Sequence, residues 1–338
     1  AAAKNGMYGY TRVSEDVIES YLRWQQRRNG WSAAADWFRF TPGVVTAINL
    51  LLLSETEEGD EVLIQRPVYY PFADSIQQQK RTVVNSPLHL KNGRYEIDFE
   101  DFEQKTASPQ CKAFILSNPH NPVGRVYTEE ELRRLGEICL KHHVFVIADE
   151  IHSDLIFPGH RHVVFASLGR DYAENCAVCH APSKTFNLAG LSFSCILIPN
   201  QARRERFDRM FARYCRAHPN FFAPVAAKAA WDYGEDWLNS CLSYIQKNDQ
   251  FVREFAENTW HGDVWISPLE GTYLQWIDFR KLEPDPERLR QTMLYQARVA
   301  MDEGSMFGAE GNGFERLNLA APRKVIAEIM DRIAAALR

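Results

Sequence analysis

Long apolar segments and an excess of positive charge are both missing from this sequence. No apolar run approaches the roughly 18 residues that a membrane-spanning helix needs, and no basic-then-apolar leader opens the chain. Lysine and arginine (39) are outnumbered by aspartate and glutamate (44), which gives a net charge of -5 without a basic stripe. These absences argue against a membrane protein, an exported protein and a nucleic-acid-binding protein, and they leave small molecules as the expected partners.

A disulfide framework, internal repeats and low-complexity segments are missing as well. The seven cysteines are scattered over 338 residues, and an odd number in a chain of this size is typical of reduced thiols in a cytoplasm. Cys176 and Cys179 form a C-x-x-C pair, but we expect them on a strand, where residues three apart point to opposite faces. The sequence therefore predicts a cytoplasmic protein in which this pair is neither a redox centre nor a metal-binding site.

The pattern that is present is an alternation of apolar strands and amphipathic helices. With 45% apolar and 12% aromatic residues, the chain can bury a large core. Strands are predicted at 61–65, 112–116, 144–148, 177–180 and 194–198, and helices at 14–28, 44–53, 203–213, 224–233 and after Thr128, where Glu131 completes a capping box. This alternation predicts an α/β fold with a mostly parallel central sheet flanked by helices.

The last hundred residues have a different organisation. A long helix at 237–255 is followed by predicted strands at 264–266, 273–277 and 314–319 and by a closing helix at 323–337. We therefore predict a large domain at 1–237 and a smaller C-terminal α+β domain at 238–338, with the long helix as a bridge.

One lysine has the surroundings of a reactive group. Lys184 lies between the predicted strands at 177–180 and 194–198, so we expect it at a strand end and not on a solvated helix. A lysine in an apolar cleft is partly unprotonated near neutral pH and attacks a carbonyl to form a Schiff base. Since most single lysines are surface residues, this interpretation depends on the residues that accompany Lys184.

Three other functional side chains also follow predicted strands. Tyr69 lies in Arg66–Pro71, where two prolines exclude a helix, and Asn121 and Asp149 come after the strands at 112–116 and 144–148. The carboxyl ends of parallel strands share one edge of a sheet, and ligands bind there. Four such placements, with Lys184, predict a ligand site at this edge.

An aromatic aldehyde with a phosphate and a ring nitrogen would use each of these groups. The turn Pro42–Gly43 leads into the buried helix at 44–53, so free backbone amides of Gly43, Val44 and Val45 would hold the phosphate. Tyr69 would stack on the ring, Asn121 would bond the ring hydroxyl, Asp149 would keep the ring nitrogen protonated, and Arg316 would grip a substrate carboxylate. Lys184, once released, would remove the α-proton of an amino acid.

Seven short motifs are shared with one enzyme family. They are Gly9-Tyr10-Thr11 and residues 41–45, 67–69, 119–125, 149–152, 182–191 and 267–273. From Gly6 to the C-terminus, the chain resembles the fold-type I pyridoxal-phosphate (PLP) enzymes of the class I/II aminotransferase family, and within it the cystathionine β-lyase subgroup typified by MalY, PatB and cystalysin. The resemblance implies the fold and the residue roles given above.

The resemblance also implies roles that the residue patterns alone do not give. Tyr10 matches a tyrosine that reaches the phosphate in the neighbouring subunit's active site, which implies a homodimer with Tyr10 as a catalytic-site residue. Ser183 is expected to assist at the phosphate. His152 stands near the ring hydroxyl, where ordinary aminotransferases usually have a tyrosine, and in this it is similar to the lyases.

Two departures from the family pattern concern the phosphate site and the start of the chain. Aminotransferases commonly carry a phosphate-binding arginine eight residues after the lysine, whereas this sequence has Ser192 there; the lyases tend to have a polar residue at that position. The resemblance also implies an N-terminal arm of several tens of residues before Gly9, which the 338 residues do not include.

The function implied by the resemblance is a PLP-dependent carbon-sulfur β-lyase that converts cystathionine or cysteine S-conjugates to pyruvate, ammonia and a thiol. An aminotransferase, and a regulatory or binding protein on the same fold, stay open as alternatives. A metal site is a weaker alternative, because residues 149 and 150 would point to opposite sides of a strand, and we expect no metal. Its ligands would come from Asp149, Glu150, His152, Asp154, His160 and His162.

Overall fold

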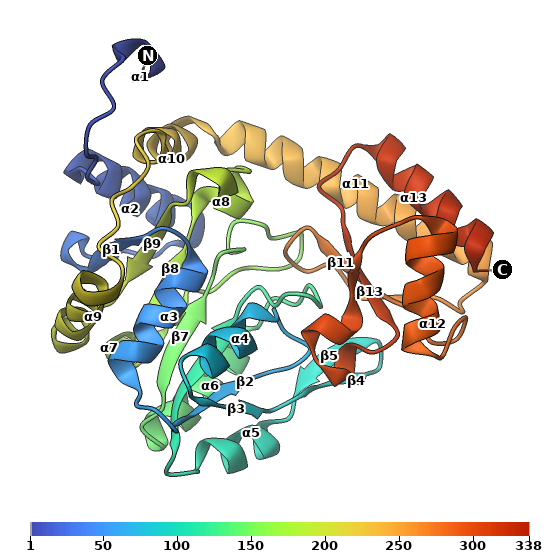
Figure 1. The fold of residues 1–338 in the computed structure, drawn as a ribbon, viewed down its shortest axis with the longest axis horizontal. Helices are drawn as coiled ribbons and strands as arrows, with labels where there is room; N and C mark the ends of the chain where they lie inside the picture. Colours follow the sequence, from blue (N-terminus) through green and yellow to red (C-terminus); the bar gives the residue numbers. More distant parts are fainter. Residues whose placement is uncertain (1, 338) are drawn as a thin grey trace.

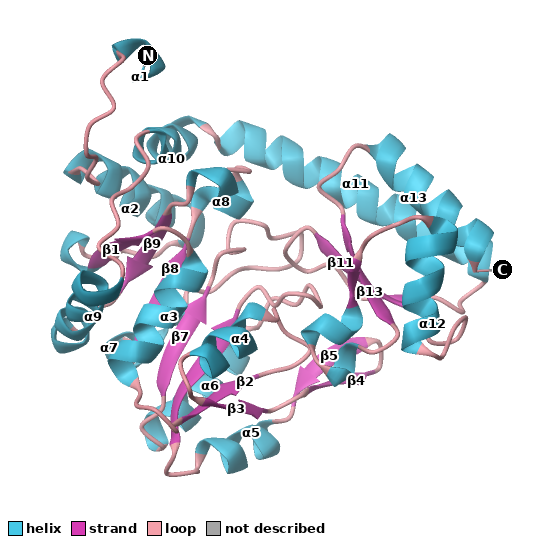
Figure 2. Ribbon diagram, in the orientation of Figure 1, coloured by secondary structure: helices cyan, strands magenta, loops and turns pink. Residues whose placement is uncertain are grey.

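A seven-stranded sheet forms the centre of the large part of the molecule in the computed structural model, which describes residues 2–337 (Figures 1 and 2). Its strands, in the spatial order β1-β9-β8-β7-β6-β2-β3, are β1 (Phe38–Thr41), β9 (Ser194–Leu197), β8 (Cys176–His180), β7 (Phe145–Asp149), β6 (Cys111–Ser117), β2 (Glu61–Ile64) and β3 (Thr82–Asn85). Neighbours from β3 to β8 are parallel, and only β9 runs antiparallel to its neighbours β8 and β1. The predicted mostly parallel sheet is confirmed.

Helices cover both faces of this sheet. They are α2 (Glu15–Asn29), α3 (Val44–Glu55), α4 (Pro71–Gln78), α5 (Phe99–Thr106), α6 (Glu129–Lys141), α7 (Arg170–Glu174), α8 (Pro182–Thr185), α9 (Gln201–Tyr214) and α10 (Phe222–Tyr233), preceded by the short α1 (Ala2–Asn5). Alternate residues of each strand enter two separate cores, so that Phe114 packs on one face and Ile115 on the other. Both faces are therefore apolar, which explains the continuous hydrophobic runs in the sequence.

The cysteines follow the same alternation. Cys176 packs in one core and Cys179 in the opposite one, as predicted for two positions three apart on a strand. All seven cysteines are unpaired, and five of them are buried. Burial raises the pKa of the Cys111 thiol to about 12 and also raises the pKa values of the buried Cys139, Cys176, Cys179 and Cys195 thiols.

Local sequence explains where several helices begin and end. Ser14 precedes α2, and Gly30 ends it in the left-handed region at φ 67°. The capping box of Thr128 and Glu131 is present at the start of α6. The prolines at 67 and 71 exclude a helix only up to residue 70, because Pro71 occupies the first position of α4, where its missing N–H costs nothing. This correction adds a helix that we did not predict.

A second, four-stranded sheet forms the C-terminal part of the molecule. All its strands are antiparallel, in the order β10 (Trp265–Ile266), β11 (Leu274–Asp278), β13 (Phe314–Asn318) and β12 (Asp302–Glu303). It packs with α12 (Pro286–Gln291) and α13 (Arg323–Ala336), and the hairpin β4 (Leu88–Lys91)–β5 (Arg94–Ile97) belongs to neither large sheet. Among residues 2–337, no helix combines the length and apolarity required to cross a membrane.

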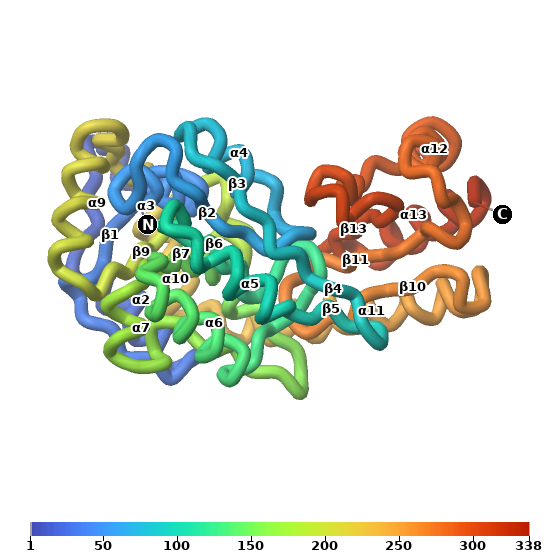
Figure 3. Tube along the Cα trace, turned by 90° about the horizontal axis from the view of Figure 1, so that it is seen from below, coloured from blue at the N-terminus to red at the C-terminus, as the bar shows by residue number. Residues whose placement is uncertain are grey.

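One long helix connects the two parts. α11 (Glu235–Trp260) runs along the molecule from the large sheet to the C-terminal sheet, and Figures 1 and 3 show it from two sides. Its Leu238 packs in the core of the large sheet, whereas Ile245 and Val252 pack in the core of the C-terminal sheet. The division that we predict after residue 237 falls in the first turn of this helix and stays a prediction.

Candidate active site

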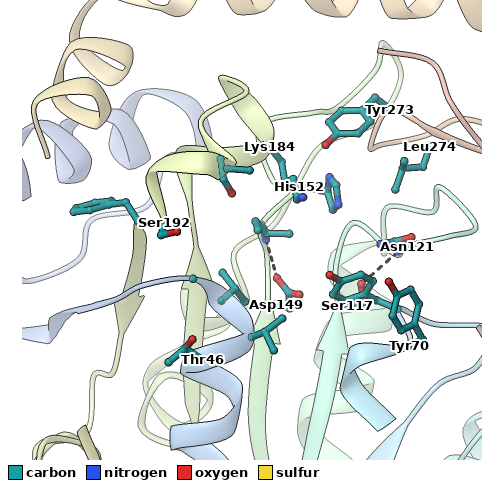
Figure 4. A pocket seen from close by; sticks show the side chains of 18 of the residues that line it. Thr46, Tyr70, Ser117, Asn121, Asp149, His152, Lys184, Ser192, Tyr273 and Leu274 are labelled. Atoms are coloured by element: carbon teal, nitrogen blue, oxygen red, sulfur yellow. Dashed lines mark hydrogen bonds between the residues drawn. The ribbon is translucent and has the colours of Figure 1, made fainter. Parts of the chain in front are cut away.

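The predicted strand-end residues line a single cleft. It measures about 430 Å³, within the range of small-molecule sites, and lies where the carboxyl ends of the parallel strands face the C-terminal sheet. Figure 4 shows Lys184 and Asp149 in this cleft, together with His152, Asn121 and Tyr273. The sequence-predicted residues among its lining are Gly43, Val44, Val45, Tyr69, Asn121, Asp149, His152, Ser183, Lys184 and Arg316.

Lys184 enters the cleft from a very short helix. Strand β8 ends at His180, and Pro182 begins the single turn α8, which contains Lys184 and ends at Thr185. The lysine therefore lies four residues beyond the strand end, on a helical turn that the sequence did not predict. The amide of Phe186 closes this turn by donating to the carbonyl of Pro182 at 2.9 Å.

The start of helix α3 forms one end of the cleft. Helix α3 begins at Val44, so the amides of its first turn have no partner within the helix. The Gly43 amide already donates to the hydroxyl of Ser194 at 3.2 Å. Of the three amides predicted to bind a phosphate, those of Val44 and Val45 are therefore the more available. The hydroxyl-bearing residues Thr46, Ser183 and Ser192 line the same cleft.

Gly43 is needed at this turn for conformational reasons. Its φ of 131° lies in a region that residues with a side chain rarely adopt. Thr41, on the preceding strand, shares a 2.7 Å hydrogen bond between its hydroxyl and that of Ser194. Ser194 thus bonds both sides of the turn. Glycine at position 43 allows the chain to enter α3 so that the first residues of the helix line the cleft.

Asp149 is a buried carboxyl group opposite an amine. It is 6% exposed, and its Oδ1 accepts the Ile151 amide at 3.1 Å. Burial raises the pKa of Asp149 to about 7, although the Ile151 hydrogen bond and the charge of Lys184 act in the opposite direction. Such a carboxyl group is ready to take a cationic partner, because a positive charge beside it would offset the cost of burial.

His152 is kept neutral by burial and by two nearby cations, Lys184 and Arg316. Burial lowers the pKa of His152 to about 3, with smaller contributions from Lys184 and Arg316. Its ring packs edge-on against Tyr273, with centroids 5.7 Å apart, and its Nδ1 has no hydrogen-bond partner. A buried ring nitrogen without a partner is rare in proteins. Because His152 lines the cleft, this nitrogen is available to a bound group.

Arg316 brings the C-terminal sheet into the site. Its Nη1 donates to Oδ1 of Asn121 at 2.7 Å, its Nη2 pairs with Asp302 on β12, and its Nε is buried without a partner. Its guanidinium carbon also lies 4.8 Å from the centroid of the Phe307 ring. A cation so arranged can bind a carboxylate, and it lies beside the residue predicted to contact the cofactor ring.

Several lining residues were missed by the sequence reasoning. They include Thr46, Tyr70, Ser117, Tyr273, Leu274 and Asn318. Asn318 could have been found, because it lies two positions from Arg316 on β13 and therefore on the same face. Tyr273 belongs to the motif at 267–273, but nothing local indicates that this loop meets the ring-binding residues.

Tyr10 lies outside the cleft of its own chain. Its side chain is 95% exposed and packs against the His218 ring at 5.4 Å. It belongs to the segment between α1 and α2, where Met7 and Tyr8 are also exposed. This position leaves the Tyr10 ring free to reach another molecule.

The six residues proposed for the metal alternative do not gather at one site, although two of them, Glu150 and His162, do meet. Asp149 and His152 line the cleft, whereas Glu150 points to the opposite side of the sheet, as expected for adjacent residues at a strand end. Within residues 2–337, the potential ligands that do come together as a group of three are Glu150, His162 and His180, all buried. Sequence reasoning missed His180, because β8 brings it to Glu150 from 30 residues away.

This second cluster already satisfies its carboxylate by hydrogen bonds. Oε2 of Glu150 lies 2.9 Å from Nε2 of His162 and 3.0 Å from Nε2 of His180, and Oε1 accepts the Phe165 amide. Burial opposes ionisation of Glu150, but the two histidines outweigh it and lower its pKa to about 2. The cluster thus joins β7, β8 and the loop at 158–164 behind the cleft.

The sequence model of the class I and II aminotransferases matches residues 1–333. This chain belongs to that family. It is similar to cystathionine beta-lyase PatB of Bacillus subtilis, with 40% identity over 98% of this chain and 86% of PatB. It is also similar to MalY of Escherichia coli, with 28% identity over 99% of this chain and 85% of MalY.

Solved structures of the aminotransferase family agree with this assignment. Cystalysin from Treponema denticola, which contains pyridoxal 5'-phosphate, has a TM-score of 0.97 and 38% identity over 99% of this chain and 85% of its own. A PLP-bound C-S lyase from Staphylococcus hominis has a TM-score of 0.93 and 31% identity over 99% of this chain and 87% of its own. The predicted family and fold type are therefore confirmed.

Proposed function

We propose that this chain is a PLP-dependent carbon-sulfur β-lyase that acts on cystathionine or cysteine S-conjugates and yields pyruvate, ammonia and a thiol. The observation that carries the proposal is the placement of Lys184 and Asp149 in one cleft beside the amides of α3. The likeness to PatB, MalY, cystalysin and a C-S lyase supports the lyase reaction over other reactions of the family.

The residues of the cleft fit PLP by their chemistry. An anion-binding helix start suits the phosphate, the buried Asp149 suits a protonated ring nitrogen, and the amine of Lys184 suits the aldehyde. The partnerless Nδ1 of His152 and the amide of Asn121 suit the ring hydroxyl. Tyr69 would stack on the ring, with Ser183 at the phosphate. When bound, PLP supplies an electron sink that stabilises negative charge at the substrate Cα.

The chain's own residues then have distinct tasks. Lys184 takes the α-proton of the substrate, and the C–S bond at Cβ breaks with departure of a thiolate, which is protonated to the thiol. Water hydrolyses the remaining three-carbon unit to pyruvate and ammonia. Asp149 keeps the ring nitrogen protonated, and Arg316 holds the substrate carboxylate so that the Cα–H bond stays near Lys184.

A direct assay separates the lyase from the aminotransferase alternative. The purified protein, reconstituted with PLP, is given cystathionine alone, and pyruvate and free thiol are measured. We expect both products in equal amounts without any added keto acid. If amino-group exchange occurs only when a keto acid is supplied and no thiol is released, the lyase proposal is wrong. If neither reaction occurs although PLP binds, the binding-protein alternative gains support.

Replacing Arg316 is expected to weaken substrate binding more than the chemical step. Each hydrogen bond to a charged group contributes about 1.5–3 kcal/mol, so Arg316→Gln should raise KM for cystathionine about 10- to 100-fold. Steady-state kinetics measure this change, and Arg323→Gln, whose guanidinium bonds Asn248 far from the cleft, is the matched control. An unchanged KM would exclude Arg316 as the carboxylate-binding group.

The exposed Tyr10 supports a homodimer in which each subunit completes its neighbour's site. Each variant alone, Tyr10→Ala or Lys184→Ala, forms dimers in which both sites are defective, so each should have low activity. A mixture of the two variants, unfolded and refolded together, should regain up to about a quarter of wild-type activity, because half the dimers are mixed and carry one intact site. No recovery in a mixture that forms dimers by sedimentation would contradict the shared site.

We also propose that the protein works in the cytoplasm. Its seven cysteines are all unpaired, and five of them are buried. Such thiols are typical of a reducing compartment.

A further inference from the structure

The geometry points to Asp154 as a positioning residue for Lys184. This inference rests on the proposed role of Lys184 and concerns a buried carboxylate that the proposed chemistry does not use. Asp154 follows His152 by two residues on the loop after β7, and it contacts the turn that carries Lys184. It therefore connects the two segments whose relative position determines the site.

The connection consists of two hydrogen bonds from separate parts of the chain. Oδ2 of Asp154 accepts the hydroxyl of Thr185 at 2.8 Å, and Oδ1 accepts the indole N–H of Trp24 on α2 at 3.0 Å. All three side chains are buried, with exposures of 0% for Trp24, 2% for Thr185 and 7% for Asp154. These bonds form in an environment without competing water, where a lost partner is costly.

The turn of Lys184 requires such external support. Helix α8 has four residues, its N-cap residue Ala181 makes no side-chain cap, and one turn of helix is not stable by itself. Thr185, which bonds Asp154, directly follows Lys184, and the next residue, Phe186, packs edge-on against the Trp24 ring with centroids 5.5 Å apart. Asp154 and Trp24 therefore contact the two residues that directly follow the reactive lysine.

The opposite end of the connection is anchored as well. The amide of Leu155 donates to the carbonyl of His152 at 2.9 Å, and the Leu155 carbonyl accepts the Thr272 amide from the C-terminal part at 2.8 Å. The loop that carries Asp154 is thus fixed to the residue that faces the ring and to the segment before β11. A displacement of about 1 Å at Lys184 is enough to reduce the rate of proton transfer about 100-fold.

Three variants separate positioning from charge. Thr185→Val removes the donor at constant shape, and Asp154→Ala removes both acceptors. Asp154→Asn keeps both bonds, because its oxygen accepts from Trp24 while its NH2 group donates to the Thr185 hydroxyl. We expect kcat for cystathionine to fall 10- to 100-fold in the first two variants with KM changed less than threefold, and to stay within about threefold of wild type in Asp154→Asn.

A spectroscopic readout distinguishes positioning from loss of stability. The pH midpoint of the visible absorption of bound cofactor reports on the geometry of Lys184, and we expect it to move by at least about half a unit in Thr185→Val and Asp154→Ala. The matched control is Thr106→Val, which removes a buried hydroxyl that bonds the Phe102 carbonyl on α5 at 2.6 Å, away from the cleft. Thermal unfolding of the cofactor-free proteins measures stability separately.

The outcomes are distinguishable. If Thr185→Val and Asp154→Ala match Thr106→Val in midpoint and kcat, or if kcat falls only in proportion to the fraction unfolded, the positioning role is refuted. If Asp154→Asn is as inactive as Asp154→Ala, the carboxylate charge and not its hydrogen bonds is required, and the inference fails. Borohydride reduction of the wild type tests the underlying proposal, because an adduct on another lysine would refute the role of Lys184 itself.

Discussion

Lys184→Ala is expected to lower kcat for cystathionine by at least about 10⁴-fold, because one amine both binds the cofactor and moves the α-proton. Borohydride reduction of the wild type should fix the cofactor covalently on the peptide that contains residue 184, and the variant should yield no such peptide. Absorption spectra, peptide mapping by mass spectrometry and pyruvate release measure these changes. Free PLP should still bind weakly to the variant, since Val44, Val45 and Asp149 are unchanged.

The control for this experiment is a lysine outside the cleft. Lys141 ends α6, is 64% exposed at its side chain and pairs with Glu103. Lys141→Ala should keep turnover and the covalent adduct at wild-type levels. Turnover above about 1% of wild type in Lys184→Ala, after removal of contaminating host enzymes, would contradict the assignment of Lys184 as the base.

Asp149→Asn is expected to have opposite effects on activity and stability. Without the carboxylate, the ring nitrogen of bound PLP loses the group that keeps it protonated, and removal of one such electrostatic partner costs about 10²- to 10³-fold in kcat. The same substitution should stabilise the cofactor-free protein at neutral and alkaline pH, because Asp149 is a buried acid whose ionised form is disfavoured in the folded state.

The sign of the pH dependence follows from the two pKa values. The folded protein holds the Asp149 proton up to a pKa of about 7, whereas the unfolded chain releases it near 3.8. The folded state therefore binds more protons between these values, and the free energy of unfolding of the wild type falls as pH rises through this window. At pH 8 the variant should be more stable by up to roughly 4 kcal/mol, and the difference should vanish near pH 4.

Chemical denaturation of the two cofactor-free proteins at pH 4.5 and pH 8 measures this difference. Burial also raises the pKa of Glu315 to about 8, with help from the charges of Glu303 and Asp302, so both proteins should lose stability towards alkaline pH. Only the difference between them reports on Asp149. A variant that is less stable than wild type at pH 8 would show that the carboxylate has a stabilising partner in the empty cleft.

The central sheet could be predicted because its strands are buried on both faces. Val144 to Ala148 is apolar at every position, and the residues that follow such strands meet at one edge whatever their exact order. This is why Tyr69, Asn121, Asp149 and Lys184 could be grouped from the sequence. The capping box at Thr128 and Glu131 was predictable for a different reason, since all its interactions lie within four residues.

The parts that could not be predicted depend on contacts between distant segments. Asp302 meets Arg316 only because β12 and β13 pair in one particular register. Trp24, Asp154 and Thr185 are separated by 130 and 31 positions, and no local pattern marks any of them. The Ser194 hydroxyl that takes the Gly43 amide comes from a strand 151 residues away. Propensity and periodicity describe neighbours in sequence and contain no information on such pairs.

The burial of the cysteines has a consequence for an enzyme that works among its own sulfur products. Thiols released at the cleft oxidise readily and form mixed disulfides with protein thiolates, and this exchange requires an accessible sulfur with a lowered pKa. The five interior cysteines are inaccessible, and their raised pKa values keep them protonated. Accumulating product therefore finds no reactive sulfur inside the fold, and mixed disulfides are expected only at the partly buried Cys215 and Cys241.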